Sequence, residues 1–242
     1  MGGLIDIEGA RALVSDRTLW PLVRDFLWDF APQVHSSWIE GLEVLKVGGA
    51  EGSYSLAPKL SNSRTFKRFV LSSLGVEPCF HVFPKDDWSR LLLLDGATLE
   101  SLAKWLGALA CADALRGVTS GKAVRALKAA LPGVYPEVFG YTAYFNVNAN
   151  KPEVEGRDGE KSDVGGREPD AEGVVAAGWG ILSASLAHLP ESLLRRLALK
   201  LPKSFQSLGG LRGESDNTAF DKRMIAKLLK LKFPEAYSLC CS

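Results

Sequence analysis

Hydrophobic residues recur along most of this chain at steps of three and four, the period of an α-helix with one buried face. The first such stripe runs from residue 19 to residue 30 and stops before Pro32, since proline cannot continue a helix. Further stripes predict helices over residues 34–47, 65–74, 84–94, 98–116, 119–131, 171–189, 191–201 and 220–231. The pattern therefore predicts an all-α, irregular multi-helix globular protein.

Two short segments fit this pattern less well. Residues 79–83 alternate as a β-strand would, but Pro84 follows directly and no second strand is evident to pair with them. We therefore expect a connector there. The aromatic segment at 138–147 does not indicate one type of element by its pattern alone.

The hydrophobic pattern stops between residues 148 and 172. From residue 151 to 172 there are eight acidic and four basic residues, with many glycines, so we expect an acidic flexible linker or insertion. This divides the chain into an N-terminal helical region, 1–147, the linker, and a C-terminal helical region, 173–242. We expect the C-terminal region to pack on the first as one continuous domain.

Composition and charge exclude several classes of protein. Residues of the AVILMFWYC set make up 46% of the chain and the net charge is +1 over 242 residues. The apolar fraction is too high for a wholly disordered chain, and the small net charge gives no support to a nucleic-acid binder. The charge is unevenly placed, however, because residues 191–234 carry ten bases and four acids.

Recognisable catalytic chemistry is scarce. Residues 117–123 approach a phosphate-binding loop, but the spacing is one residue short, Ala123 occupies the Ser/Thr position, and a helix rather than a strand leads in. Asp86 and Asp87 are explained by the positive end of a predicted helix. The four cysteines and three histidines form no metal-binding spacing. We predict no enzyme, no catalytic residue, no cofactor and no metal.

Two alternatives stay open. Cys79, His81 and His188 could meet in space in a small helical metal protein or enzyme, because such sites form in the fold and not in the sequence. Residues 173–190 carry no charge, so a peripheral protein of the membrane surface is the second alternative, although the run is short for a span and rich in Ala, Gly and Ser. Ala176, Gly180 and Ala184 would let a neighbouring helix approach closely.

A binding role points first to the basic C-terminal third. The candidates for contact with a protein partner, chosen from charge placement alone, are Arg195, Arg196, Arg223, Lys227 and Lys230. An exposed basic face is also compatible with a purely solubilising role. Trp28 and Trp105 lie off their helices' main stripes, which suits a protein interface or a second internal packing face.

Two stretches carry a resemblance. An apolar helix containing Trp179-Gly180-Ile181-Leu182 is followed by Arg196-Leu197-Ala198-Leu199-Lys200-Leu201-Pro202, and a basic amphipathic helix closes with residues 227–234. Upstream lie residues 19–22 with Pro32 and a leucine-rich pair of helices at 91–131. This order resembles the YscK/PscK (SctK) family of type III secretion accessory proteins, over most of the chain; the acidic insertion has no place in the family pattern.

The resemblance implies a non-enzymatic adaptor of the injectisome's sorting platform. Members of the family link the cytoplasmic domain of the inner-membrane ring protein (SctD) to the pod protein (SctQ), so protein partners of these two kinds are expected. It also implies a place in the bacterial cytoplasm, at the cytoplasmic face of the inner membrane, without membrane insertion. It identifies no contact residues.

Overall fold

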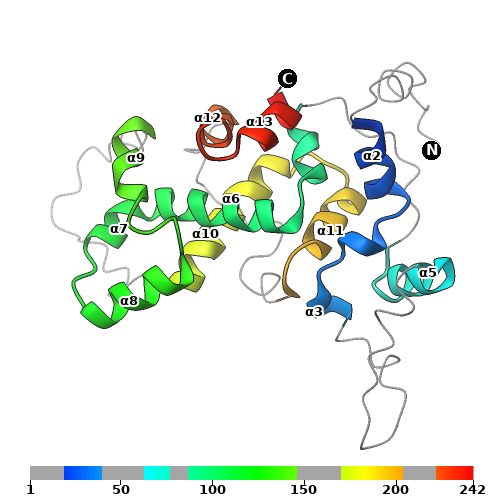
Figure 1. Ribbon diagram of the computed structural model, residues 1–242, viewed down its shortest axis with the longest axis horizontal. Coiled ribbons are helices and arrows are strands. Elements are labelled where there is room, and N and C mark those ends of the chain that lie inside the picture. The colour runs from blue at the N-terminus through cyan, green and yellow to red at the C-terminus, as the bar shows by residue number, and fades with distance from the viewer. Residues whose placement is uncertain (1–18, 40–62, 77–86, 146–169, 204–221, 242) are drawn as a thin grey trace, which may run out of the picture. The chain divides into compact units, whose positions relative to one another are not determined.

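The computed structural model describes residues 19–39, 63–76, 87–145, 170–203 and 222–241, and every regular element in these ranges is a helix (Figure 1). The predicted all-α fold class is therefore confirmed. Residues 79–83, the helix expected beyond residue 39 and most of the acidic insertion lie outside the described residues.

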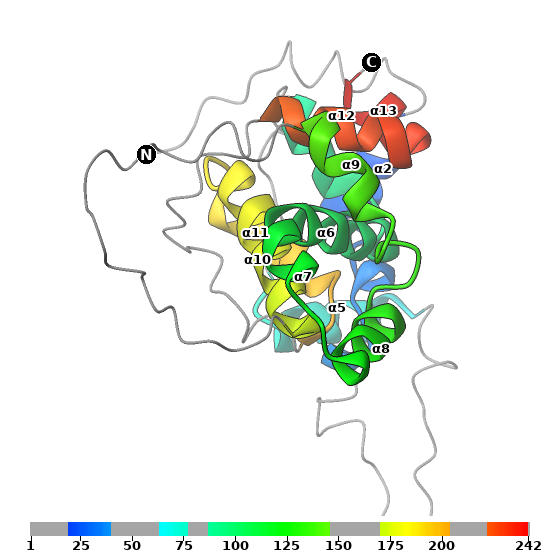
Figure 2. The same ribbon diagram turned by 90° about the vertical axis from the view of Figure 1, so that its left-hand side faces the viewer.

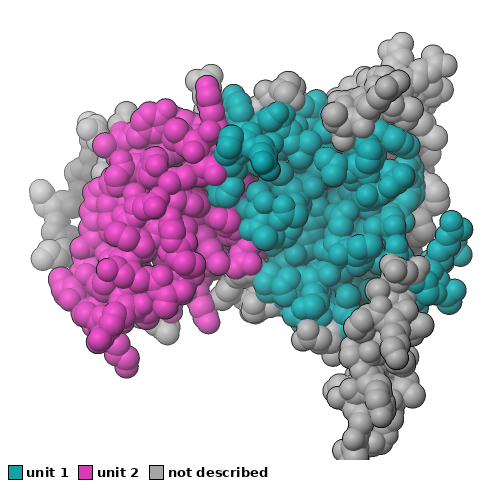
Figure 3. All heavy atoms as spheres, in the orientation of Figure 1, with its two compact units in different colours: residues 1–99, 186–207, 233–242 teal, residues 100–185, 208–232 magenta. Residues whose placement is uncertain are grey.

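The chain divides into two compact units that are each assembled from separated segments (Figure 3). Unit 1 comprises residues 1–99, 186–207 and 233–242, and unit 2 comprises residues 100–185 and 208–232. Both the 1–147 and the 173–242 regions thus contribute to each unit. That the two regions make one continuous domain stays a prediction.

Unit 1 is built around α2 (Leu19–Leu27), whose apolar residues recur at three- and four-residue steps. Leu19, Val23, Phe26 and Leu27 are buried, as the stripe predicted, whereas Leu22 of the same stripe is exposed. The chain then turns through the short helix η1 at Pro32. The other elements of this unit are η1 (Ala31–Gln33), α3 (Ser36–Ile39), α5 (Arg64–Ser73), η3 (Asp87–Leu93), α11 (Glu191–Leu199) and α13 (Pro234–Cys241).

Neighbouring elements of unit 1 are joined by backbone and side-chain hydrogen bonds. Trp38 donates from Nε1 to the carbonyl of Leu201 at 2.8 Å, which holds α3 against the end of α11. Helix α13 packs on η3, where Arg90 donates to the carbonyl of Leu239 at 3.3 Å. Gly75, with φ of +63°, ends α5, because glycine adopts this left-handed conformation without strain.

Unit 2 contains most of α6 (Gly96–Ala110) and of α10 (Ala171–Leu186), which cross in both ribbon views (Figure 2). At the crossing, a Cβ added to Gly107 would collide with the carbonyl oxygen of Val174, and one added to Gly178 with that of Ala103. The backbones therefore touch at a pair of facing glycines. The other elements are α7 (Ala112–Arg116), α8 (Gly121–Ala130), α9 (Val138–Phe145) and α12 (Lys222–Lys232).

Polar side chains set the starts of three helices. Asp95, directly before α6, accepts from the backbone N–H of Thr98 at 2.8 Å, and Asp170 accepts from Gly173 N–H at 2.7 Å before α10. Ser120 accepts more weakly from Ala123 N–H at 3.5 Å before α8. These bonds satisfy N–H groups that have no partner within the first turn.

The structure differs from the sequence prediction at three elements. The helix expected over 98–116 is interrupted at Cys111, between α6 and α7, and the segment 87–93 is a 3₁₀-helix. Helix α13 was not predicted, because Pro234 looked like the end of the preceding helix. Proline is equally compatible with the first turn of a new helix, and it begins α13.

Candidate partner-binding surfaces

The two neighbouring arginines of α11 have different environments. Arg195 is exposed and donates from Nη2 to the carbonyl of Leu74 at 2.8 Å, beside the turn that ends α5. Arg196 is only 1% exposed and donates from Nη1 to the carbonyl of Phe26 at 2.9 Å. Of this pair, Arg195 is the residue that a partner can reach in this structure.

Arg196 and Lys200 form a ladder of cations against aromatic rings in unit 1. The guanidinium carbon of Arg196 lies 5.3 Å from the ring centre of Phe30, and Nζ of Lys200 lies 4.9 Å from that of Phe26. Arg196 and Lys200 are four residues apart at the end of α11, so they lie on one face of it, and Phe26 and Phe30 have the same spacing at the end of α2 and just beyond it. The two rings meet edge to face at 5.5 Å. The guanidinium of Arg196 keeps its charge at all ordinary pH values, and a desolvated cation–π contact of this kind contributes about 2 kcal/mol.

Lys200 is buried as well and is bonded to a neighbouring element. It is 3% exposed, and its Nζ donates to the carbonyls of Leu92 at 2.5 Å and Leu94 at 2.8 Å, at the end of η3. Gly96 makes this approach feasible, since a Cβ there would lie 2.5 Å from the Lys200 carbonyl oxygen. Burial lowers the pKa of Lys200 to about 7, and the charge of Asp95 opposes this only in part.

The pKa of Asp95 is also lowered, which for a carboxyl group favours the charged form. Partial burial alone would raise the pKa of Asp95, but hydrogen bonds from the backbone and hydroxyl of Thr98 outweigh this and lower it. Asp95 therefore stays ionised near the buried Lys200. Both side chains serve the junction between η3, α6 and α11.

We expect Arg196→Ala to reduce the free energy of unfolding by about 2–4 kcal/mol, because it leaves a cavity and removes the donor from a buried carbonyl. Arg195→Ala, one residue away on the exposed side, is the matched control and should cost less than about 1 kcal/mol. Urea denaturation followed by circular dichroism measures both. Equal losses for the two variants would contradict a structural role specific to Arg196.

The lysines of α12 differ in their exposure and in the contacts that they make. Lys227 donates to the carbonyl of Tyr144 at 2.8 Å and lies 3.6 Å from the centre of its ring. Lys232 pairs with Glu137 at 2.8 Å and lies 4.4 Å from the ring centre of Trp105. Lys230 is exposed. The backbone of Arg223 belongs to α12, but its side chain lies outside the described residues.

The environment of Lys232 favours its charged form. Desolvation by itself would lower the pKa of Lys232, but hydrogen bonds to Glu137 and Tyr141 outweigh it, so the pKa is raised. Tyr141 and Trp105 also meet edge to face at 5.6 Å. Helices α6, α9 and α12 are thus held together in unit 2 by a cation between two aromatic rings.

The two tryptophans that sequence placed off their helices' stripes differ in the structure. Trp28 is 52% exposed and contacts the ring of Trp20 at 5.5 Å, so it is available at the surface of unit 1. Trp105 is 4% exposed and belongs to the aromatic contacts below Lys232. Only Trp28 retains the environment expected of an interface residue.

The residues of the metal or enzyme alternative are only partly described. Cys79 and His81 lie outside the described residues, and His188 is exposed at the end of α10. Among the residues that the structure describes, no three His, Cys, Asp or Glu side chains gather as metal ligands. Burial raises the pKa of the Cys111 thiol, which disfavours the reactive thiolate there.

The uncharged run that suggested membrane contact falls largely on α10. Within the described ranges, no helix combines the length and the hydropathy that crossing a bilayer requires. Val174, Ile181 and Leu182 of α10 are buried in the protein.

These observations define an all-α protein whose chemistry, in the described residues, consists of packing contacts and basic surfaces. Comparison with known families makes this specific: the model of the family described as YOP proteins translocation protein K (YscK) matches residues 50–242. The chain belongs to the YscK family and is a protein of the type III secretion apparatus. No curated protein and no solved structure matches the chain significantly.

The stretch that carried the resemblance now has a physical explanation. Residues 196–202 contain two buried basic residues of unit 1, Arg196 and Lys200. The leucines of the same stretch are buried as well: Leu197, Leu199 and Leu201. Sequence reasoning missed Lys200. The available signal was a lysine between two leucines before Pro202, at a helix end where a basic side chain can bind the carbonyls of a neighbouring element.

Proposed function

We propose that this chain is a non-enzymatic adaptor of the type III secretion sorting platform. It would link the cytoplasmic domain of the inner-membrane ring protein (SctD-like) to the pod protein (SctQ-like), at the cytoplasmic face of the inner membrane. The observation that carries the proposal is the YscK family match over residues 50–242. No cofactor, metal or catalytic residue is part of it.

Two-sided binding requires two separate contact surfaces. Each stable contact buries about 800 Å² per partner, and contacts that exchange are smaller and have polar rims. The two compact units each offer exposed cations from the basic C-terminal third, Arg195 in unit 1 and Lys230 in unit 2. These are the rim residues that we propose.

The other sequence-derived candidates enter the proposal differently. Arg196 supports α11, which presents Arg195, through its bond to Phe26. Lys227 holds α12 to α9 through Tyr144, so it supports the helix that presents Lys230. Arg223 lies one turn before Lys227 on α12 and stays a candidate for direct contact.

The direct test is binding of the purified full chain to each partner and then to both. We expect micromolar or tighter binding to the pod protein and to the ring domain, and a ternary complex when all three are mixed. If the two partners compete for the chain, the linking role is wrong. If neither binds at micromolar concentration, the adaptor proposal fails altogether.

A charge reversal tests the rim residues. We expect Lys230→Glu to weaken capture of one partner several-fold, because it replaces attraction by repulsion at an exposed position, and to change the free energy of unfolding by less than about 1 kcal/mol. Arg68→Glu, an exposed cation of α5, is the matched control. Equal effects of the two reversals on capture would assign the α12 cation a solubilising role only.

A further inference from the structure

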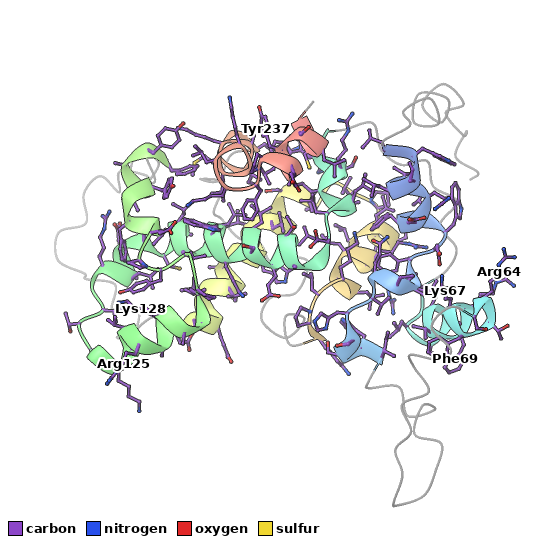
Figure 4. The ribbon with its side chains drawn as sticks, viewed as in Figure 1. Arg64, Lys67, Phe69, Arg125, Lys128 and Tyr237 are labelled. Atoms are coloured by element: carbon purple, nitrogen blue, oxygen red, sulfur yellow. The ribbon has the colours of Figure 1, made fainter. Side chains whose placement is uncertain are left out.

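Helix α8 presents a basic face that the sequence reading did not single out. Lys122, Arg125 and Lys128 are all exposed and follow one another at three-residue steps, so they form one row along the helix. Figure 4 marks two of them, Arg125 and Lys128. The helix contains no acidic residue, and its only fully buried residue is Leu127.

Within the described ranges, these three cations make almost no contacts with the rest of the protein. Arg125 donates only to the carbonyl of Gly121 in its own helix, at 3.2 Å, and neither lysine bonds or pairs with any described residue. Three acidic residues of unit 2 are paired with other cations. Glu100 pairs with Lys104 at 2.6 Å, Asp113 with Arg116 at 3.6 Å, and Glu137 with Lys232 at 2.8 Å.

Helix α12 differs from α8 because two of its lysines are engaged within unit 2. The lysines of α12 at 227 and 232 are stacked on rings and bonded to acceptors, so part of their binding capacity is already used. The row on α8 is unpaired among the described residues. Unpaired charges spaced within a Debye length, about 8 Å at physiological salt, act together on an approaching partner.

The surface beside the three cations consists of small apolar side chains. Ala126, Ala129 and Ala130 are exposed, and at 100° per residue they lie next to the cations on the solvent side of α8. Small residues let a second helix approach closely, and flanking charges set its orientation. A helix with a mildly apolar stripe bordered by Asp or Glu is complementary to this face.

We propose that the exposed face of α8 is a docking surface for an acidic segment of another protein of the secretion apparatus, held by Lys122, Arg125 and Lys128. The choice of that partner class rests on the proposed adaptor function. A membrane is disfavoured as the occupant, because surface helices that bind lipid carry bulky apolar residues and the exposed apolar residues of α8 are alanines. No aromatic side chain on α8 offers a base-stacking platform.

The test compares two neutralised variants of the full chain. Lys122→Gln, Arg125→Gln and Lys128→Gln are combined in one variant, and Arg64→Gln with Arg68→Gln on exposed positions of α5 form the control. Association rates with purified pod protein and with the ring domain are measured at low and moderate salt. We expect the α8 variant to associate about tenfold more slowly with one partner, with a reduced salt dependence, and the control to resemble wild type.

Each outcome decides between the proposals. If the α8 variant binds the partners as fast as wild type does, the docking surface is wrong, and the adaptor function is unaffected. Equal losses in both variants also overturn it, because the effect would then come from net charge. Binding of wild type, but not of the α8 variant, to vesicles containing phosphatidylglycerol would assign the face to a membrane instead.

If wild type binds neither purified partner, the adaptor function is wrong. A second measurement then tests the docking surface on α8. A photo-crosslinking residue at Ala126 in secreting cells should then attach to an acidic segment of a secretion protein, and the three glutamine substitutions should abolish that product. No protein adduct, or an adduct that persists after neutralisation, overturns the docking surface.

Discussion

Gly178→Ala is expected to reduce the free energy of unfolding by about 3–5 kcal/mol, because the added methyl group has no room at the crossing of α6 and α10. A Cβ at residue 178 would lie 2.7 Å from the backbone nitrogen of Gly107 and would collide with the carbonyl of Ala103. Backbone atoms of a helix cannot rotate aside as a side chain can. The two helices would have to separate, with loss of their packing.

Gly180→Ala on the same helix is the matched control. Nothing lies within 4 Å of a Cβ at residue 180, so the methyl group is tolerated there and helix propensity favours alanine by up to about 1 kcal/mol. Urea denaturation of both variants measures the difference. A Gly178→Ala protein as stable as Gly180→Ala would show that the helices do not approach as described.

Gly107→Ala tests the same contact from the other helix. Its Cβ would meet the carbonyl of Val174 and lie 2.9 Å from the backbone nitrogen of Gly178, so a similar loss is expected. Because both substitutions separate the same two helices, the double variant should lose less than the sum of the single losses. Additive losses would place the two glycines in different contacts.

The second large effect is a pH dependence carried by Lys200. Its pKa in the folded protein is about 7, whereas an unfolded chain restores the ordinary value near 10.5. Between these values the unfolded state binds more protons, so stability rises with pH by about 1.4 kcal/mol per pH unit. Below pH 7 both states hold the proton, and the cost of burying the charge is present in full.

Lys200→Met isolates this contribution, since it keeps an unbranched side chain of similar length without the titrating group. We expect the free energy of unfolding to rise by about 3 kcal/mol less in the variant than in wild type between pH 6 and pH 9.5. The comparison of slopes removes the effect of other titrating groups. Parallel pH profiles would mean that Lys200 stays fully charged in the folded protein.

Sequence reasoning predicted the helical class and most helices, because the apolar stripes of α2, α6 and α11 are periodic and bounded by capping residues or prolines. It placed the close approach of α10 on Ala176, Gly180 and Ala184, whereas Gly178 makes it. The spacing of small residues shows that a neighbouring helix can approach that face of α10. Which residue makes the contact depends on where the neighbouring helix has a glycine of its own.

Charge placement along the chain was a weaker guide to the binding surface. It treated Arg195 and Arg196 alike, although one is exposed and the other buried, because a linear count of bases does not show which ones find carbonyl groups and aromatic rings in the fold. It also passed over α8, whose three cations at regular spacing without an acid were visible in the sequence. The prediction followed the number of basic residues in a segment, and it did not consider whether acidic residues lie beside them.

The interleaving of the two units has a consequence for how this polypeptide can be divided and made. Residues 186–207 of unit 1 lie between the two segments of unit 2, and residues 233–242 return to unit 1. No single cleavage of the chain can release either unit intact. During synthesis unit 2 cannot complete its contacts before residue 232 has left the ribosome, and unit 1 also needs residues 233–242; such sequence-distant contacts slow folding.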